Sequence, residues 1–289
     1  MEKTAFVFAG GGSLGAIEAG MLRELIASGV QPDFLVGASA GAINSVFFAY
    51  QPHMAGAMQL ESLWRGIRRQ QIMPWSLLAI LGAFRAGGTH LVSSAKLRAL
   101  LYAQFGSRSL EDCDLPVHVV ATDMKTGNEV VISAGPAVEA VLASTAIPGV
   151  FPPVALAGNL LIDGGVANNT PISTAIRLGA TRVIVLCTGF TCAQRRQPKG
   201  ALEHAMSALN LLVARQLVSD LEHWAAHANI SVVTPLCPLD VSPYDYSQCG
   251  LLIDRAAAET RRWLASGGLA SRAIPGALKL HSHGETAET

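Results

Sequence analysis

Between a short apolar stretch and a helical pattern, the chain carries Gly37-Ala38-Ser39-Ala40-Gly41, which matches the pattern G-x-S-x-G. A serine in this pattern sits on a sharp strand-to-helix turn and exposes its hydroxyl at the top of a sheet. Gly37 and Gly41 stand where strand and helix approach too closely for side chains. The positive end of the following helix favours negative charge that develops beside the hydroxyl. The pattern predicts a nucleophilic Ser39, and the alternative interpretation is a tight turn in an Ala- and Gly-rich chain.

A second glycine-rich segment, Gly10-Gly11-Gly12-Ser13-Leu14-Gly15, lies between an apolar strand pattern and a helical pattern. As G-x-G-x-x-G it fits a dinucleotide fingerprint, which needs an acidic residue at the end of the second strand. Asp33 has about the right spacing but precedes that strand, which is the wrong end. The second interpretation is an oxyanion hole made by the amides of Gly11 and Gly12. The nearby elbow favours the oxyanion hole, and a phosphate-binding loop is the third interpretation.

A serine nucleophile needs a general base. None of the eight histidines lies in a glycine-rich loop of the kind that presents a triad histidine: His53, His90, His118, His204, His223, His227, His281 and His283. An α/β-hydrolase needs several strands before its elbow, and only two precede Ser39. The better candidate is Asp163, which leaves an apolar strand into the loop glycines Gly164 and Gly165. A partly buried aspartate is more basic than a free one, although D-G-G alone is more often an ordinary turn.

Short apolar runs alternate with longer helical patterns along the chain. Strands are predicted at 4–9, 34–36, 117–122, 129–133 and 181–188, and helices at 16–28, 40–50, 201–228 and 254–266. Another helix is expected after Thr170, which can cap its amides, with Pro171 in the first helical position and Gly179 beyond its end. This alternation predicts an α/β fold whose mainly parallel sheet is covered by helices on both faces.

Four elements stand in order along the chain: Gly10–Gly15, Gly37–Gly41, Ala143–Pro153 and Asp163–Gly165. Together they resemble the patatin-like phospholipase family over roughly residues 4–186, and the joint match is much more specific than any single motif. The resemblance implies a three-layer α/β/α sandwich and a Ser-Asp dyad without histidine. It implies that Ser39 is the nucleophile and Asp163 the base, and it implies that the oxyanion loop is formed by Gly10, Gly11 and Gly12.

One departure from the family concerns Leu14, because the family's glycine loop usually carries Arg or Lys there. Without that cation, the loop lacks a group that would position a substrate phosphate. We therefore expect neutral or short-chain esters to be turned over better than phospholipids. We also expect Leu14, Pro148 and Phe151 to line the substrate site.

Composition and charge narrow the class of protein. The chain of 289 residues is 50% hydrophobic and 15% charged, which excludes intrinsic disorder. Its 21 Lys and Arg balance 21 Asp and Glu, so there is no broad basic surface for nucleic acid or an anionic bilayer. The start lacks a signal-peptide pattern, and five cysteines without a C-x-x-C pair suggest a cytosolic protein. We expect one domain over residues 1–266 and a tail over 267–289 that is loose from about residue 281.

Two weaker patterns each have a plainer interpretation. Residues 64–81 place arginines beside tryptophans and leucines, as in an interfacial segment or lid, or else in a core helix with a solvated basic end. His223 and His227 are four residues apart on a predicted helix, but the sequence H-E-x-x-H is absent. No metal site is expected there.

The residues and the resemblance together predict a serine lipid acyl hydrolase that cleaves phospholipid, lysophospholipid or neutral acyl esters through an acyl-enzyme. The alternatives are an acyltransferase that uses the same Ser39 intermediate, and a weakly hydrolytic lipid-binding or regulatory protein. No cofactor and no nucleic-acid partner are expected. The expected location is the cytoplasm, with peripheral contact to a membrane, and the sequence leaves the oligomeric state unspecified.

Overall fold

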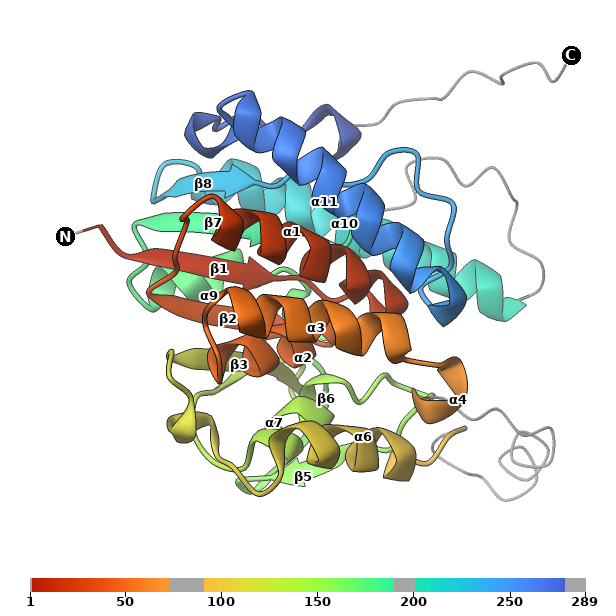
Figure 1. Cartoon of the computed structure of the whole chain (residues 1–289). Helices are drawn as coiled ribbons and strands as arrows, with labels where there is room; N and C mark the ends of the chain where they lie inside the picture. The colour runs from red at the N-terminus through yellow and green to blue at the C-terminus, as the bar shows by residue number, and fades with distance from the viewer. Residues whose placement is uncertain (1, 73–90, 190–200, 279–289) are drawn as a thin grey trace, which may run out of the picture.

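The computed structural model describes residues 2–72, 91–189 and 201–278 (Figure 1). Its centre is an eight-stranded sheet in which consecutive strands of the path β5-β6-β3-β2-β1-β7-β8 pair with one another, and β4 also pairs with β3. The strands β3, β2, β1, β7 and β8 are parallel to one another, whereas β4, β5 and β6 join by antiparallel pairs. Their bounds are β1 Thr4–Phe8, β2 Phe34–Ala38, β3 Val117–Asp123, β4 Glu129–Ile132, β5 Val154–Leu156, β6 Asn159–Asp163, β7 Arg182–Leu186 and β8 Asn229–Val232.

Helices cover both faces of the sheet. Figure 1 looks onto the face covered by α1 (Gly15–Ala27), α2 (Ala40–Ala49), α3 (Met54–Gly66) and α11 (Cys249–Ala265), with α6 (Ala95–Phe105) and α7 (Ala137–Ser144) below them. The opposite face carries α9 (Ile172–Arg177) and α10 (Ala201–Trp224), and the short helices are α4 (Arg69–Ile72) and α8 (Gly165–Asn168). The predicted three-layer α/β/α sandwich is confirmed.

The hydrophobic core consists of two clusters, one on each face of the sheet, because successive side chains of a strand point to opposite faces. On β1, Phe6 and Phe8 belong to the cluster beneath α1, α2 and α11, whereas Ala5 and Val7 belong to the cluster beneath α9 and α10. All four side chains are fully buried. Successive side chains of a strand point to opposite faces, so a strand covered on both sides is apolar throughout. This is why residues 5–9 form a continuous apolar run rather than an alternating pattern.

The predicted start of α9 is wrong in one detail. Pro171 is itself the residue that caps α9, with φ −76° and ψ 58°, and no side chain caps the helix. These angles form an inverse γ-turn, in which the Ile172 N–H donates to the Thr170 carbonyl at 2.7 Å. Thr170 therefore stands one place too early for its hydroxyl to cap the helix. That hydroxyl is buried and has no hydrogen-bond partner among the described residues.

The expected boundary near residue 266 stays a prediction. Residues 268–270 form a short 3-10 helix, and Leu269 packs against the core. Its carbonyl accepts a hydrogen bond from Ser231 Oγ at 3.0 Å. The residues expected to be loose from about 281 lie outside the described part of the chain.

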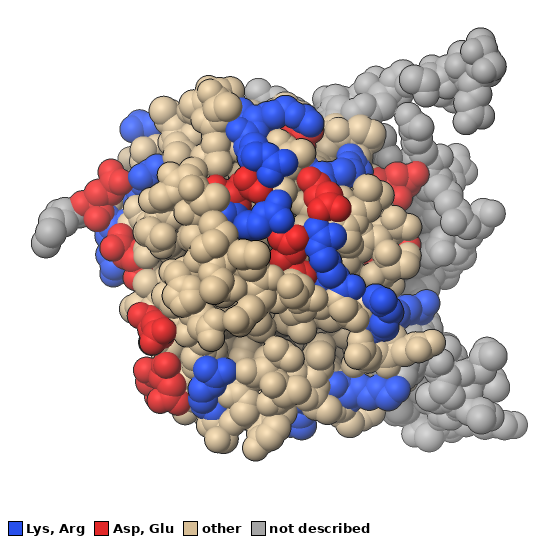
Figure 2. Space-filling model, in the orientation of Figure 1, with Lys and Arg blue, Asp and Glu red and all other residues tan. Residues whose placement is uncertain are grey.

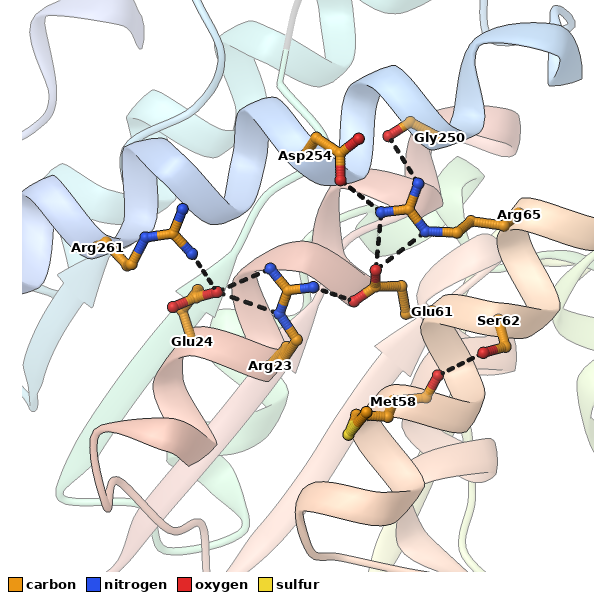
Figure 3. A network of polar contacts seen from close by, with 9 residues as sticks. All are labelled: Arg23, Glu24, Met58, Glu61, Ser62, Arg65, Gly250, Asp254 and Arg261. Atoms are coloured by element: carbon orange, nitrogen blue, oxygen red, sulfur yellow. Dashed lines mark hydrogen bonds and ion pairs between the residues drawn. The ribbon is translucent and has the colours of Figure 1, made fainter.

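A network of charged side chains ties α1, α3 and α11 together (Figure 3). Arg23 bridges Glu24 and Glu61, Arg261 of α11 donates to Glu24, and Arg65 joins Glu61 to α11. The two glutamates are mostly buried, with side-chain exposures of 10% and 12%. On the same face the basic and acidic side chains intermingle (Figure 2). Opposite charges thus compensate one another over these three helices.

Across the described residues, no helix has both the length and the apolar character needed to cross a membrane. The longest helix of the described residues, α10, has 24 residues and carries the charged residues Arg215, Asp220 and Glu222. The ring centroids of His223, in the last turn of α10, and of His227, which follows the helix, are 6.0 Å apart.

Gly20 tests the contact between α1 and α11. A Cβ at this position would lie 2.4 Å from the Ile253 carbonyl oxygen, a backbone atom that cannot turn aside. We expect Gly20→Ala to lower the free energy of unfolding by ~1–3 kcal/mol through overpacking. Gly66→Ala is the matched control, because nothing lies within 4 Å of its added methyl. Urea unfolding that finds the two variants equally stable would contradict the close helix contact.

Candidate active site

Ser39 lies on the sharp turn between β2 and α2. Its backbone has φ 53° and ψ −121°, a positive φ that is costly for a residue with a Cβ. A Cβ at Gly37 would lie 2.3 Å from the Gly41 carbonyl oxygen, and a Cβ at Gly41 would lie 2.3 Å from the Phe8 carbonyl oxygen. Both elbow glycines are therefore required by the backbone contacts that the turn creates. Ser39 therefore lies on a strand-to-helix turn of the kind that the pattern G-x-S-x-G describes.

Asp163 meets Ser39 across 124 residues of sequence. The Ser39 hydroxyl donates to Asp163 Oδ2 at 2.7 Å, and the Gly165 N–H donates to Asp163 Oδ1 at 2.7 Å. Both residues are buried, with exposed fractions of 7% for Ser39 and 6% for Asp163. Burial raises the pKa of the Asp163 carboxyl to about 6, against the lowering effect of the hydrogen bonds from Ser39 and Gly165. The carboxyl is therefore held by two donors and remains more basic than a free aspartate.

The register on β3 explains why these two residues meet. Residues 35–38 of β2 pair with β3 residues 117–120, and residues 161–163 of β6 pair with β3 residues 121–123. Strand β4 pairs with β3 residues 119–122. These include residues that also pair with β2 and residues that also pair with β6, so β4 must occupy the opposite edge of β3. Strands β2 and β6 thus share one edge of β3, one after the other. Ala38 is opposite Val120 and Asp163 is opposite Ala121, which brings the two strand ends together.

The base loop is packed as closely as the elbow. A Cβ at Gly164 would lie 2.1 Å from the Val120 carbonyl oxygen, and a Cβ at Gly165 would lie 2.7 Å from Asn169 Oδ1. The Thr122 hydroxyl donates to the Asp163 carbonyl at 2.8 Å. These contacts explain the two glycines after Asp163 and hold the backbone at the end of β6 in place.

The glycine loop lies against Ser39. A Cβ at Gly10 would lie 3.1 Å from Ser39 Cβ. The Gly10 N–H is already used, because it donates to the Asn169 carbonyl at 2.9 Å. The N–H groups of Gly11 and Gly12 make no hydrogen bond to any described backbone or side-chain group. Of the three glycines expected to stabilise an oxyanion, two therefore have amides that a ligand can use.

A buried polar chain supports the start of this loop. Glu18 is fully buried, and its carboxylate accepts from the Ala9 N–H at 2.6 Å and from Asn44 Nδ2 at 2.7 Å. The Trp64 ring N–H donates to Asn44 Oδ1 at 2.7 Å. Burial raises the pKa of Glu18 well above its ordinary value, against the lowering effect of these hydrogen bonds. Glu18 thus anchors the amide that immediately precedes Gly10.

Asp33 does not lie at the glycine loop. Its carboxylate accepts from the Thr4 N–H at 2.6 Å, at the opposite end of β1 from Gly10. It therefore cannot hold the ribose of a dinucleotide whose phosphates would sit on that loop. The structure excludes the dinucleotide interpretation that the spacing alone allowed.

A cavity of about 120 Å³ opens above Ser39. Its floor is formed by Ser39, Asp163 and the glycine loop, and its apolar wall includes Leu14, Pro148 and Val166. A second cavity of about 40 Å³ also reaches Ser39 and is lined by Trp64, Leu97 and Phe151 among others. The structure therefore places Leu14 and Pro148 at the larger cavity and Phe151 at the smaller one.

Several residues at the site carried no recognised signal in the sequence. Asn169 and Thr188 line the larger cavity, and Tyr244 lines both. Burial raises the pKa of Tyr244, and the negative charge of Asp163 raises it further, so its phenol remains neutral. Ser144 accepts from the Ser39 N–H at 2.8 Å. Ser144 belongs to the quoted stretch 143–153, which offered the only available signal for it.

The segment 64–81 is only partly described. Trp64 is 1% exposed and belongs to the core, and Arg65 pairs with Glu61. This part therefore follows the core-helix interpretation. Residues 73–81, which carried most of the predicted lipid-facing character, lie outside the described residues.

Comparisons with known proteins identify the family to which the chain is similar. A family model described as patatin-like phospholipase matches residues 6–176, more than half of the chain. Neuropathy target esterase sws of Drosophila melanogaster is 26% identical over 185 residues, which is 63% of this chain and 13% of that protein. An uncharacterised NTE family protein of Mycobacterium tuberculosis is 33% identical over 165 residues, which is 57% of this chain and 27% of that protein. The chain thus spans less than a third of the length of either relative.

The fold also matches a solved structure. VipD from Legionella pneumophila superposes with a TM-score of 0.50 at 15% identity, covering 92% of this chain and 67% of that one. At this identity the likeness concerns the fold alone.

Asp163 should lower stability as the pH rises. Its folded-state pKa of about 6 exceeds the ordinary value, so the unfolded chain releases this proton at lower pH than the folded one. Well below pH 4 both states are protonated and there is no penalty; the penalty grows from about pH 4 to about pH 6 and then stays constant at ~3 kcal/mol. The stability of Asp163→Asn relative to the wild type should therefore increase as the pH rises across this range. Urea unfolding at several pH values measures the difference, and a difference that does not change with pH would contradict the raised pKa.

Proposed function

Because the chain belongs to the patatin-like phospholipase family, we propose that it is a serine lipid acyl hydrolase with Ser39 as nucleophile and Asp163 as base. The observation that carries the proposal is the 2.7 Å hydrogen bond from the Ser39 hydroxyl to Asp163 Oδ2, at the floor of a mainly apolar cavity. The esterase and phospholipase names of the relatives support the same class of reaction. Since the chain covers only part of the length of those proteins, the proposed activity is argued from the geometry of this site.

Acylation begins with proton transfer. Asp163 takes the Ser39 proton as Oγ attacks the ester carbonyl carbon, and the carbonyl oxygen becomes an oxyanion. The N–H groups of Gly11 and Gly12 stabilise this charge, together with the N-terminal end of α2, which begins directly after Ser39. Asp163 then returns the proton to the departing alcohol, which leaves the acyl group on Ser39.

Deacylation repeats the sequence with water. Asp163, unprotonated again, takes a proton from a water molecule that attacks the acyl carbonyl. The same glycine amides hold the second oxyanion, and the proton passes back to Ser39 as the fatty acid leaves. A base with a pKa near 6 suits both steps, because it is ionised at neutral pH yet still accepts a proton.

The cavity favours an apolar ester. None of the described residues that line the two cavities is Lys or Arg. Leu14 is 3% exposed and presents an apolar wall beside Ser39. A phosphate would find no fixed cation among the described residues of these walls, so a neutral or short-chain acyl ester is the substrate that we propose. Val166 is 47% exposed and adds apolar surface at the larger cavity.

Ser39→Ala tests the nucleophile. The change removes the hydroxyl without altering the core, so we expect hydrolysis of p-nitrophenyl esters to be abolished while the Tm is maintained. Ser62→Ala is the matched control, since its exposed hydroxyl bonds only to the Met58 carbonyl within its own helix. Turnover by Ser39→Ala close to the wild-type rate would place the nucleophile elsewhere.

Neutral esters should be turned over better than defined phospholipids by the wild type.

The pH profile tests the base. Only the ionised carboxylate accepts the proton, so kcat/KM should rise with pH through about 6 and then level off. Asp163→Asn keeps the shape of the loop and should lower kcat by ~10²–10⁴-fold, the usual value of general base catalysis. A rate that is independent of pH between 5 and 8, or a mild Asp163→Asn variant, would mean that another group takes the proton.

A further inference from the structure

The carbonyl of Gly10 is held by two side chains. The Thr188 hydroxyl donates to it at 2.8 Å, and Asn169 Nδ2 donates to it at 3.3 Å. Thr188 follows the end of β7, and Asn169 follows α8. Both are buried, with exposed fractions of 3% and 9%. Two segments distant from the glycine loop therefore converge on one peptide group.

Fixing this carbonyl also fixes the next amide. The peptide between Gly10 and Gly11 is trans, since the only cis bond in the described chain is at Cys237-Pro238. In a planar trans peptide, the C=O and the following N–H point in opposite directions. The Gly11 N–H is therefore turned away from Thr188 and Asn169. It has no hydrogen-bond partner among the described residues, and Gly11 lines the cavity with Ser39.

Steric contact alone does not determine this orientation. A Cβ at Gly11 would lie 2.5 Å from Thr188 Oγ1 and 2.6 Å from its Cβ, so Gly11 is glycine because Thr188 packs directly on it. Flanking glycines leave the Gly10–Gly11 peptide free to rotate as a unit at little steric cost. The hydrogen bonds to the carbonyl are what oppose such rotation, and they also polarise the amide.

We infer that Thr188 is a positioning residue for catalysis, which orients the Gly11 N–H toward the oxyanion by holding the Gly10 carbonyl. Asn169 assists from the other side and fixes the Gly10 N–H through its own carbonyl at 2.9 Å. The inference rests on the proposed function, because an oxyanion arises only if Ser39 attacks an ester. The positioning matters most in the transition state, when the carbonyl oxygen gains its charge.

Thr188→Val and Thr188→Ser separate the hydroxyl from the shape. Valine keeps the packing and removes the donor, whereas serine keeps the donor and loses one methyl. Complete loss of an oxyanion donor lowers kcat by ~10²–10³-fold. With Asn169 still in place, we expect Thr188→Val to lower kcat by ~10–100-fold with little change in KM. Thr188→Ser should recover most of this loss.

A pair of inhibitors distinguishes positioning from a general structural role. A trifluoromethyl ketone is attacked by Ser39 Oγ, whose proton passes to Asp163 while the carbonyl oxygen becomes the oxyanion. The matched secondary alcohol binds the same cavity but cannot be attacked. We expect Thr188→Val to weaken the ketone by the same factor as kcat/KM and to leave the affinity of the alcohol within ~2-fold, since only the ketone makes an oxyanion. The midpoint of the pH profile should stay at its wild-type value, because Asp163 is not altered.

Thr260→Val is the matched control. Thr260 is also fully buried, and its hydroxyl donates to the Ala256 carbonyl at 2.7 Å within α11. It should keep wild-type kcat. The inference is overturned if Thr188→Val retains kcat within ~3-fold of the wild type, weakens both inhibitors equally, or is matched in damage by Thr188→Ser. If Ser39→Ala is inactive and Thr188→Val is unimpaired, only the inference about Thr188 is overturned. If Ser39→Ala is active, the proposed function and the inference are both overturned.

Discussion

The edge that β2 and β6 share on β3 places the whole candidate site. Strand β3 extends beyond the end of β2, and β6 occupies the remaining edge in the antiparallel direction. A strand parallel to β3 in that place would begin beside the end of β2 and run away from it. Its carboxyl-terminal loop would then lie far from Ser39. The antiparallel β6 instead ends at the point where β2 ends. The hydrogen bond between the Ser39 hydroxyl and Asp163 forms because β2 and β6 pair with successive parts of one edge of β3 and end next to each other.

Close backbone contacts then determine the composition of the three loops. The elbow, the glycine loop and the base loop all converge where strand ends meet helix starts, and side chains would occupy the space between them. Gly41 packs on the Phe8 carbonyl, Gly164 packs on the Val120 carbonyl, and Gly12 packs on the Pro243 carbonyl. Glycine in these loops is thus a consequence of packing. The packing also leaves peptide N–H groups uncovered beside the nucleophile, which is the arrangement that an oxyanion hole requires.

Two carboxyl groups in this compact centre are buried, and their surroundings differ. Glu18 receives an amide N–H and an asparagine donor inside the core, where it supports the entry to the glycine loop. Asp163 receives the Ser39 hydroxyl and the Gly165 amide at the floor of the cavity. Burial disfavours the charged form of both. A buried base lowers stability at neutral pH, and the two hydrophobic clusters on either side of the sheet offset that loss.

The sequence by itself determined the local features of this protein. The elbow at Ser39, the aspartate at the end of a strand, the glycine loops and the alternation of strands and helices are local, because each depends on backbone sterics or on the period of apolar residues. The tertiary structure alone decided which amides remain available, since the Gly10 N–H is used by Asn169, a residue 159 positions away. It also excluded Thr170 from its expected role as the helix cap and brought Asn169, Thr188 and Tyr244 to the cavity. Those outcomes depend on strand register and on contacts between distant segments, which no local pattern in one sequence encodes.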